Sequence, residues 1–160
     1  MKKFYLALVS YFMLSAAQAN YGVVDLDKVV QSSSYLKQQN ASLQSSLQPK
    51  NKQLDQLQKD LLTIQSKGQK AKSQAEHDQY LKEYEAKSKE LSNLHQSIQS
   101  TVQSTMRNVN EVFVGRVKKI AEQMRTENNL EVILDKNSTL AYDAKYDLTD
   151  KMIQRVNAIK

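Results

Sequence analysis

Two long stretches of the chain repeat apolar residues at intervals of three, four or seven positions, with Gln, Lys, Ser and Asp filling most places between them. The first stretch contains Leu36, Leu43, Leu47, Leu54, Leu57, Leu61 and Ile64; the second contains Tyr80, Tyr84, Leu91, Leu94, Ile98, Val102, Met106, Val109, Phe113, Val117, Ile120 and Met124. Such narrow stripes are typical of amphipathic helices that pack on each other. They predict a long antiparallel helical hairpin, a coiled-coil arm over residues 31–114, that reaches roughly 50 to 60 Å at about 1.5 Å per residue.

A polar segment around Gly68 separates the two stripes. Residues 66–70 contain no apolar side chain, and glycine favours a change of chain direction. We therefore expect the tip of the hairpin near residues 66–72.

Pro49 interrupts the first stripe. A proline inside a helix removes one backbone hydrogen bond and costs about 3 kcal/mol. Leu47 and Leu54 stay in register across it, which favours a continuous, kinked helix. The alternative is a true break, with Pro49 in the first turn of a second helix. In both cases Pro49 is a candidate flexible point in the arm.

The two ends of the chain have the composition of strands. Residues 21–26 and 130–135 are rich in β-branched and apolar residues, residues 136–138 predict a turn, and residues 139–142 predict a further strand. Asp27 is a candidate N-cap for a helix that begins near Lys28. At the other end, Asp147 is placed to cap a last helix over residues 148–158, with Asp150 as the acid of a capping box. The apolar face of this helix consists of Met152, Ile153, Val156 and Ile159.

These elements define an α+β fold: a long helical arm on a small β body formed by residues 20–30 and 115–160, with a short C-terminal helix. A three-stranded sheet of this size cannot bury enough apolar surface to be stable alone, and its edges are prone to aggregate. We therefore expect strands of identical chains to pair into a barrel between subunits. The candidate interface residues are Val23, Val24, Leu26, Leu130, Val132 and Leu134.

The first nineteen residues have the pattern of a cleaved export signal. Lys2 and Lys3 precede an apolar run over residues 4–14, and residues 17–19 have the small side chains of a cleavage site. A run of about 11 residues is shorter than the roughly 20 that span a membrane, although an uncleaved anchor is the alternative. No Cys follows it, so we expect neither a lipid anchor nor disulfide bonds. The expected protein is therefore exported and soluble, with a formal net charge of +6 before the leader is removed.

The sequence gives little support for an enzyme. His77 and His95 lie 18 positions apart on one predicted helix, or about 27 Å, so one chain cannot bring both to one metal ion. The three glycines are too far apart to form a phosphate-binding loop. We expect no catalytic residue, metal or cofactor, and no dependence on ATP.

Several residues of the arm are candidates for contact with a partner. Lys67, Lys70 and Lys72 surround the predicted tip, and no acid occurs between Leu61 and Ala75. These lysines suit acidic partners or an anionic membrane surface; alternatively, they only keep the tip soluble. Amphipathic or flexible side chains suit shallow contacts with many sequences. On this ground the further candidates are Tyr80, Tyr84 and Met106.

The end segments "YGVVDLDKVVQSS" and "LEVILDKNSTLAYDAKYDLTDKMIQRVN" and the long charged hairpin between them resemble the Skp/OmpH family of periplasmic chaperones. The resemblance covers residues 20–160, and Gly115 in "VFVGRVKKI" matches a glycine of the family's returning helix. It implies a homotrimer with a central β-barrel, from which three hairpins enclose a cavity for unfolded outer-membrane proteins. Pro49 departs from the family pattern, and no basic cluster for lipopolysaccharide can be aligned.

The resemblance makes an ATP-independent periplasmic holdase the leading hypothesis. A structural coiled-coil spacer of the envelope is the first alternative, although the chain offers neither a lipid anchor nor a wall-binding domain. A non-specific, basic nucleic-acid-binding protein is the second, suggested by a pI near 9.4. Acids are interleaved along both arms, and the export signal would remove the protein from the nucleoid. We therefore expect no specific nucleic acid partner.

Overall fold

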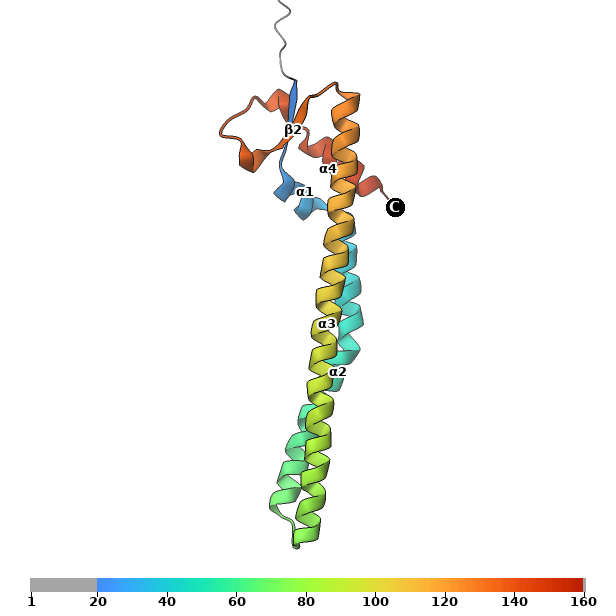
Figure 1. Cartoon of the computed structure of the whole chain (residues 1–160), viewed down its shortest axis with the longest axis vertical. Coiled ribbons are helices and arrows are strands. Elements are labelled where there is room, and N and C mark those ends of the chain that lie inside the picture. The colour runs from blue at the N-terminus through green and yellow to red at the C-terminus, as the bar shows by residue number, and fades with distance from the viewer. Residues whose placement is uncertain (1–19, 160) are drawn as a thin grey trace, which may run out of the picture.

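The structure, a computed structural model, describes residues 20–159 (Figure 1). The predicted export signal lies outside the described residues. In chain order the elements are β1 (Tyr21–Val24), α1 (Leu26–Ser32), α2 (Ser34–Gln69), α3 (Gln74–Glu127), β2 (Val132–Asp135), the 3-10 turns η1 (Lys136–Ser138) and η2 (Ala144–Tyr146), and α4 (Thr149–Ala158). The chain is therefore mostly helical, with long helices and one small sheet, which confirms the predicted fold class in outline.

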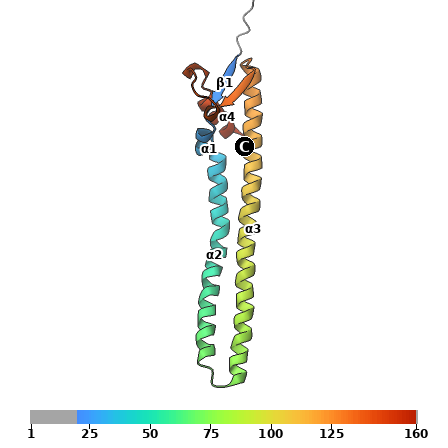
Figure 2. The same cartoon turned by 60° about the vertical axis from the view of Figure 1, so that its left-hand side comes forward.

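The two long helices form an elongated arm that projects from a small body. Helix α2 has 36 residues and α3 has 54, and the two lie side by side along the arm (Figures 1 and 2). Serine side chains begin both helices: Ser33 accepts a hydrogen bond from the backbone N–H of Leu36, and Ser73 accepts one from that of Glu76. Such N-caps satisfy backbone donors that have no partner within the helix.

The connection at the far end of the arm lies slightly later than expected. Helix α2 continues through Gly68 to Gln69, and residues 70–73 form the turn. The backbone N–H of Lys70 closes α2 by donating to the carbonyls of Lys67 and Gly68. Gly68 lies within α2 rather than in the turn, so the turn falls at the later end of the predicted tip.

Pro49 lies inside an unbroken α2. The continuous helix is confirmed at this point, and the break is wrong. Directly after the proline, the arm has a polar bridge: Lys50 Nζ donates to Ser97 Oγ at 3.2 Å and to Thr101 Oγ1 at 3.1 Å on α3. Polar contacts of this kind tie the two helices together where proline weakens the backbone ladder.

Burial along the arm is concentrated at its two ends. Leu57, Leu61 and Ile64 are buried in the outer half of α2, and Phe113, Ile120 and Met124 are buried in α3 near the body. Between them, no side chain of residues 36–56 or 74–112 is buried. The stripe residues in these segments are only partly covered, so a single arm leaves apolar surface exposed along its middle.

The sheet has two parallel strands, with Tyr21 opposite Val132 and Val24 opposite Asp135. The predicted third strand over residues 139–142 is wrong, because this segment is irregular between η1 and η2. Each 3-10 turn begins at an aspartate whose side chain accepts a backbone hydrogen bond: Asp135 from Asn137, and Asp143 from Lys145. Such local bonds compete with strand pairing and turn the chain away from the sheet.

Two helix starts differ from the predictions. Asp25 caps α1, because its Oδ1 accepts from the backbone N–H of Lys28 at 2.9 Å, so the helix begins earlier than the predicted cap Asp27 allows. Helix α4 begins at Thr149, one residue later than predicted, and its N-cap is Leu148, which makes no side-chain cap bond. The predicted cap at Asp147 is therefore wrong, although Asp147 Oδ1 accepts from the Thr149 N–H at 2.8 Å. Asp150 does not close a capping box but pairs with Lys28 Nζ at 2.9 Å.

Helix α3 ends in a turn that fits the geometry of a Schellman motif. Asn129 has a φ of 50°, its N–H donates to the carbonyl of Thr126, and the next N–H, of Leu130, donates to that of Arg125. This is the left-handed position that glycine or asparagine most often takes after a helix. The turn directs the chain from α3 into β2.

The core of the body joins β1, α1, α3 and α4. The buried cluster consists of Val24, Val29, Phe113, Ile120, Met124, Met152 and Val156. Val23 and Val24 are 0% and 1% exposed, so their side chains are already buried within one chain. A Cβ on Gly22 would lie 2.5 Å from Leu148 Cδ1, so a larger residue at this strand position would require the Leu148 side chain to move. At Gly115, by contrast, a Cβ would meet nothing within 4 Å, so no helix of the same chain approaches there.

Candidate functional site

A shallow groove of about 600 Å³ lies at the tip of the arm, between the end of α2 and the start of α3. Helix α2 contributes Ile64, Gln65, Gly68 and Gln69, and the turn contributes Ala71. Gly68, in the last turn of α2, lies opposite Tyr80 of the returning helix.

The opposite wall of this tip groove is apolar and aromatic. It is formed by His77, Tyr80, Leu81 and Tyr84 of α3. Tyr80 and Tyr84 are four positions apart and therefore share one face of the helix. Leu81 is 49% exposed and Tyr84 38%, so this wall offers apolar surface to an incoming segment. The sequence prediction did not include Leu81. It is an apolar residue beside the stripe, and the packing of the two helices does not require it.

The predicted tip lysines do not line this groove but lie next to its lining residues in the sequence. Lys67, Lys70 and Lys72 are all exposed, and each is adjacent in sequence to a residue that lines the groove. The carboxylate of Glu76 is engaged locally, since it accepts from the backbone N–H of Lys72 at 2.9 Å. The structure therefore brings together five of the six predicted client-contact residues.

Met106 is the exception. It is 54% exposed on α3 but lies 22 positions beyond Tyr84, or about 33 Å along the helix axis. Any contact of Met106 with a partner is separate from the tip groove.

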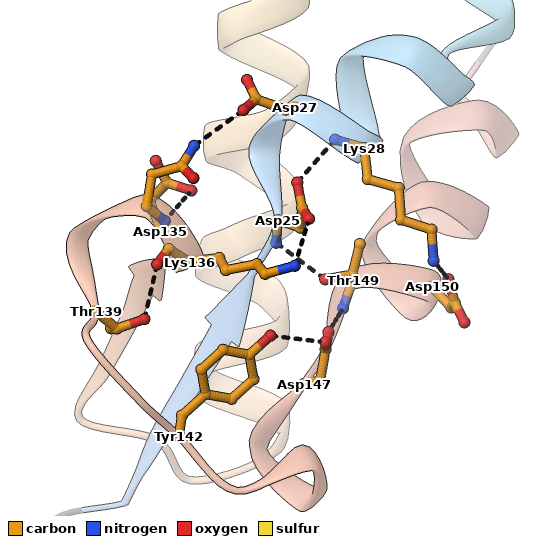
Figure 3. Close-up of polar contacts among 11 residues, drawn as sticks. Asp25, Asp27, Lys28, Asp135, Lys136, Thr139, Tyr142, Asp147, Thr149 and Asp150 are labelled. Carbon is orange, nitrogen blue, oxygen red and sulfur yellow. Dashed lines mark hydrogen bonds and ion pairs between the residues drawn. The ribbon is translucent and has the colours of Figure 1, made fainter.

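A network of polar side chains fixes the body at the other end of the molecule (Figure 3). Lys136 Nζ lies 3.0 Å from Asp25 Oδ2, and the backbone N–H of Asp25 donates to Thr149 Oγ1 at 2.9 Å. The hydroxyl of Tyr142 donates to Asp147 Oδ2 at 3.1 Å. These contacts tie the loop after β2 to α1 and α4.

The network shifts the acidity of its members. The hydrogen bond from the Lys28 backbone N–H, followed by that from the Lys136 side chain, holds the pKa of Asp25 below its ordinary value. Burial raises the pKa of Asp147, but hydrogen bonds from Thr149 and Tyr142 outweigh it and leave that pKa lowered. Burial and the bond to Asp147 together raise the pKa of Tyr142.

Acidification should therefore destabilise the body in part through Asp25. Because the folded-state pKa is below the ordinary 3.8 of aspartate, the unfolded chain takes up the proton first. The stability that Asp25 contributes is complete above the ordinary pKa of 3.8. It disappears as the pH falls through the lower folded-state pKa. We expect Asp25→Asn, which retains a capping oxygen, to lower the urea midpoint at neutral pH and to differ less from the unmodified protein near pH ~3. An equal difference at both pH values would contradict this role.

The body also exposes apolar side chains. Val132 is 41% exposed and Leu134 36%, on the face of β2 opposite to the half-buried Ile133. Leu26 is 37% exposed. Leu140, in the irregular loop, is fully exposed at 109%. Among the predicted interface residues, Leu26, Val132 and Leu134 thus remain available to another chain, whereas Leu130 is half-buried and its Cδ1 would lie 3.1 Å from a Cβ on Gly22.

The described residues contain no group of three or more His, Cys, Asp or Glu side chains that could hold a metal ion. Over the same residues, no helix is long and apolar enough to cross a membrane.

Comparisons with known proteins agree on one family. A family model described as "Outer membrane protein (OmpH-like)" matches residues 20–156. A "Skp-like protein" of Chlamydia pneumoniae is 30% identical over 162 residues, which cover 94% of each chain. A crystal structure described as an OmpH-like outer membrane chaperone from Caulobacter crescentus matches with a TM-score of 0.76 at 19% identity, over 89% of this chain and 86% of the other. At this identity the structural match shows the shared fold.

Proposed function

The chain belongs to the OmpH-like family, whose members are non-enzymatic chaperones, and from this premise we propose that it is an ATP-independent periplasmic holdase. In this role it binds unfolded outer-membrane proteins and prevents their aggregation. Periplasmic localisation follows from the same premise and from the export signal expected in residues 1–19.

The observation that carries the proposal is the partly covered apolar stripe between α2 and α3 along the middle of the arm. No side chain of residues 36–56 or 74–112 is buried, and apolar residues there remain half-exposed between polar neighbours. A surface of this kind offers many weak contacts to an extended chain and no single deep pocket. Such contacts suit a protein that must hold many different sequences and release them again.

A cavity between several arms requires several chains, and the body has the features of an interface. On one side β1 pairs with β2, and on the other Val23 bridges to Asp147 and accepts from the N–H of Leu148 at 2.8 Å. The outer edge of β2, in contrast, has no partner strand among the described residues. An unpaired edge with exposed Val132 and Leu134 is the natural place for another chain to pair. We assign this edge to the homotrimer interface.

The alternatives named from the sequence have less support. The family to which the chain belongs consists of chaperones, so it supports neither a structural spacer nor a nucleic-acid-binding protein. The basic residues outside the tip are interleaved with acids along both helices. The tip lysines are compatible with an anionic membrane surface as an additional partner.

The proposal is tested by diluting a urea-unfolded β-barrel protein into buffer with and without the purified chain. We expect turbidity to be suppressed in proportion to the chaperone present, and equally with or without ATP. Serum albumin at the same mass concentration is the control for non-specific protection. Aggregation at the rate seen with albumin would refute the holdase.

A further inference from the structure

Gly68 has no role in folding the tip of the arm. It lies within α2, one residue before the helix ends, and has no positive φ. A glycine inside a helix is about 1 kcal/mol less favourable than alanine. A Cβ at this position would make only an ordinary contact, 3.5 Å from Tyr80 Cβ. Neither the backbone nor close packing therefore demands glycine here.

Because Gly68 has no side chain, it leaves space at this position. Gly68 and Tyr80 both line the tip groove, together with the exposed Leu81 and Tyr84. A long side chain in place of Gly68 would extend over Tyr80 and occupy the groove. The absence of a side chain is thus the feature that keeps an apolar surface open in an otherwise polar helix end.

The charge around the groove is asymmetric. Lys67, Lys70 and Lys72 lie on the α2 and turn side, where residues 62–75 include no acid. The nearest acids lie on α3: the Glu76 carboxylate is taken by a backbone N–H of the turn, and Asp78 accepts from Gln74 Nε2 at 2.7 Å. Farther along α3, Lys82 lies beside Glu83. An occupant therefore meets positive charge at the turn, the bonded carboxylates of Glu76 and Asp78 at the start of α3, and Glu83 and Glu85 on either side of Tyr84.

From these observations we propose that the tip groove receives a single aromatic or branched aliphatic side chain of an unfolded segment with acidic neighbours. The apolar side chain lies against Tyr80, Leu81 and Tyr84, over Gly68. The acidic neighbours face the turn lysines, where complementary charge speeds association and favours acidic over basic segments. This inference rests on the proposed holdase function and names one class of segment and one place where it binds.

The test compares two substitutions at the same position in the full chain. Gly68→Ala adds one methyl group that contacts Tyr80 without filling the groove, whereas Gly68→Leu fills it. Both replace glycine by a good helix former, so the thermal midpoints should stay level or rise, which excludes unfolding as the cause of any loss.

The probe is a fluorescein-labelled peptide of about twelve residues with one Phe flanked by Glu, measured by fluorescence polarisation. Gly68→Ala should bind like the unmodified chain, and Gly68→Leu should bind about fivefold to tenfold more weakly, as expected for losing the burial of one side chain. Replacing the Glu residues of the peptide with Lys should weaken binding to the unmodified chain. Equal binding by all three proteins would overturn the proposal, as would Gly68-dependent binding of anionic phosphatidylglycerol vesicles without binding of the peptide.

The same proteins are also assayed for suppression of client aggregation. A full client spreads its contacts over the arms, so Gly68→Leu should reduce suppression less than it reduces peptide affinity. If all three proteins suppress aggregation but none distinguishes the peptides, the groove is wrong and the holdase stands. If none suppresses aggregation, the holdase itself has failed.

Discussion

Replacing Met124 by alanine should lower the free energy of unfolding by about 2 to 5 kcal/mol. Met124 is 0% exposed and lies within the body cluster, in contact with elements from both ends of the chain. Its removal leaves a cavity that the surrounding side chains refill only in part. Because small domains have a total stability of about 5 to 15 kcal/mol, this loss would be a large share of it.

Met106→Ala is the matched control, since Met106 is on the same helix but 54% exposed. We expect a change within about 0.5 kcal/mol for this substitution. Urea unfolding followed by far-ultraviolet circular dichroism, at one fixed protein concentration, compares the two variants. Similar shifts for both would mean that the body is not the stable centre of the fold.

Replacing Leu134 by glutamate should convert the proposed homotrimer into single chains. Leu134 is 36% exposed and lies on the strand whose outer edge is unpaired among the described residues. If another chain covers this face, a carboxylate there is buried without a partner, which costs several kcal/mol. Within one chain the position is open to solvent, so the fold of each chain should be retained.

Leu62→Glu is the control for the added charge, because Leu62 is an even more exposed leucine, at 67%, on the arm. Light scattering should give the mass of three chains for this variant and of one chain for Leu134→Glu, with the same circular dichroism spectrum for both. A trimeric Leu134→Glu protein would exclude the β2 edge as the interface. A monomeric Leu62→Glu protein would place the interface on the arm.

The long helices could be predicted from the sequence because their signal is repeated many times. Each stripe residue of α2 and α3 adds to one periodic pattern, so even Pro49 did not conceal the continuity of α2. The turn was predicted less well. Glycine is a common turn residue, but the polar residues of α2 extend the helix past Gly68 to Gln69.

Short elements could not be predicted with the same accuracy, because tertiary contacts decide them. Asp25 and Asp27 are both plausible caps in the sequence; the contacts of Asp25 with Thr149 and Lys136 favour the earlier one. Residues 139–142 have strand composition, but β propensity depends on a neighbouring strand, and the single chain offers none at that place.

The tip likewise combines features that the sequence predicts with features that it does not. Its lysines and tyrosines were recognised from their types and spacing. The groove itself depends on how the two helices are rotated about the turn, which brings Gly68 opposite Tyr80. No pattern along the sequence encodes that rotation. Neither the place of Leu81 in the groove nor the role of Gly68 could therefore be predicted from the sequence.

The most direct test of the central claim is the mass of the purified protein, residues 20–160, measured by light scattering alone and after mixing with a urea-diluted outer-membrane β-barrel protein. A holdase that encloses its client between arms should have the mass of three chains alone and of three chains plus one client after mixing, with the client kept in solution. A single chain that leaves the client to aggregate would contradict both the assembly and the function proposed for it.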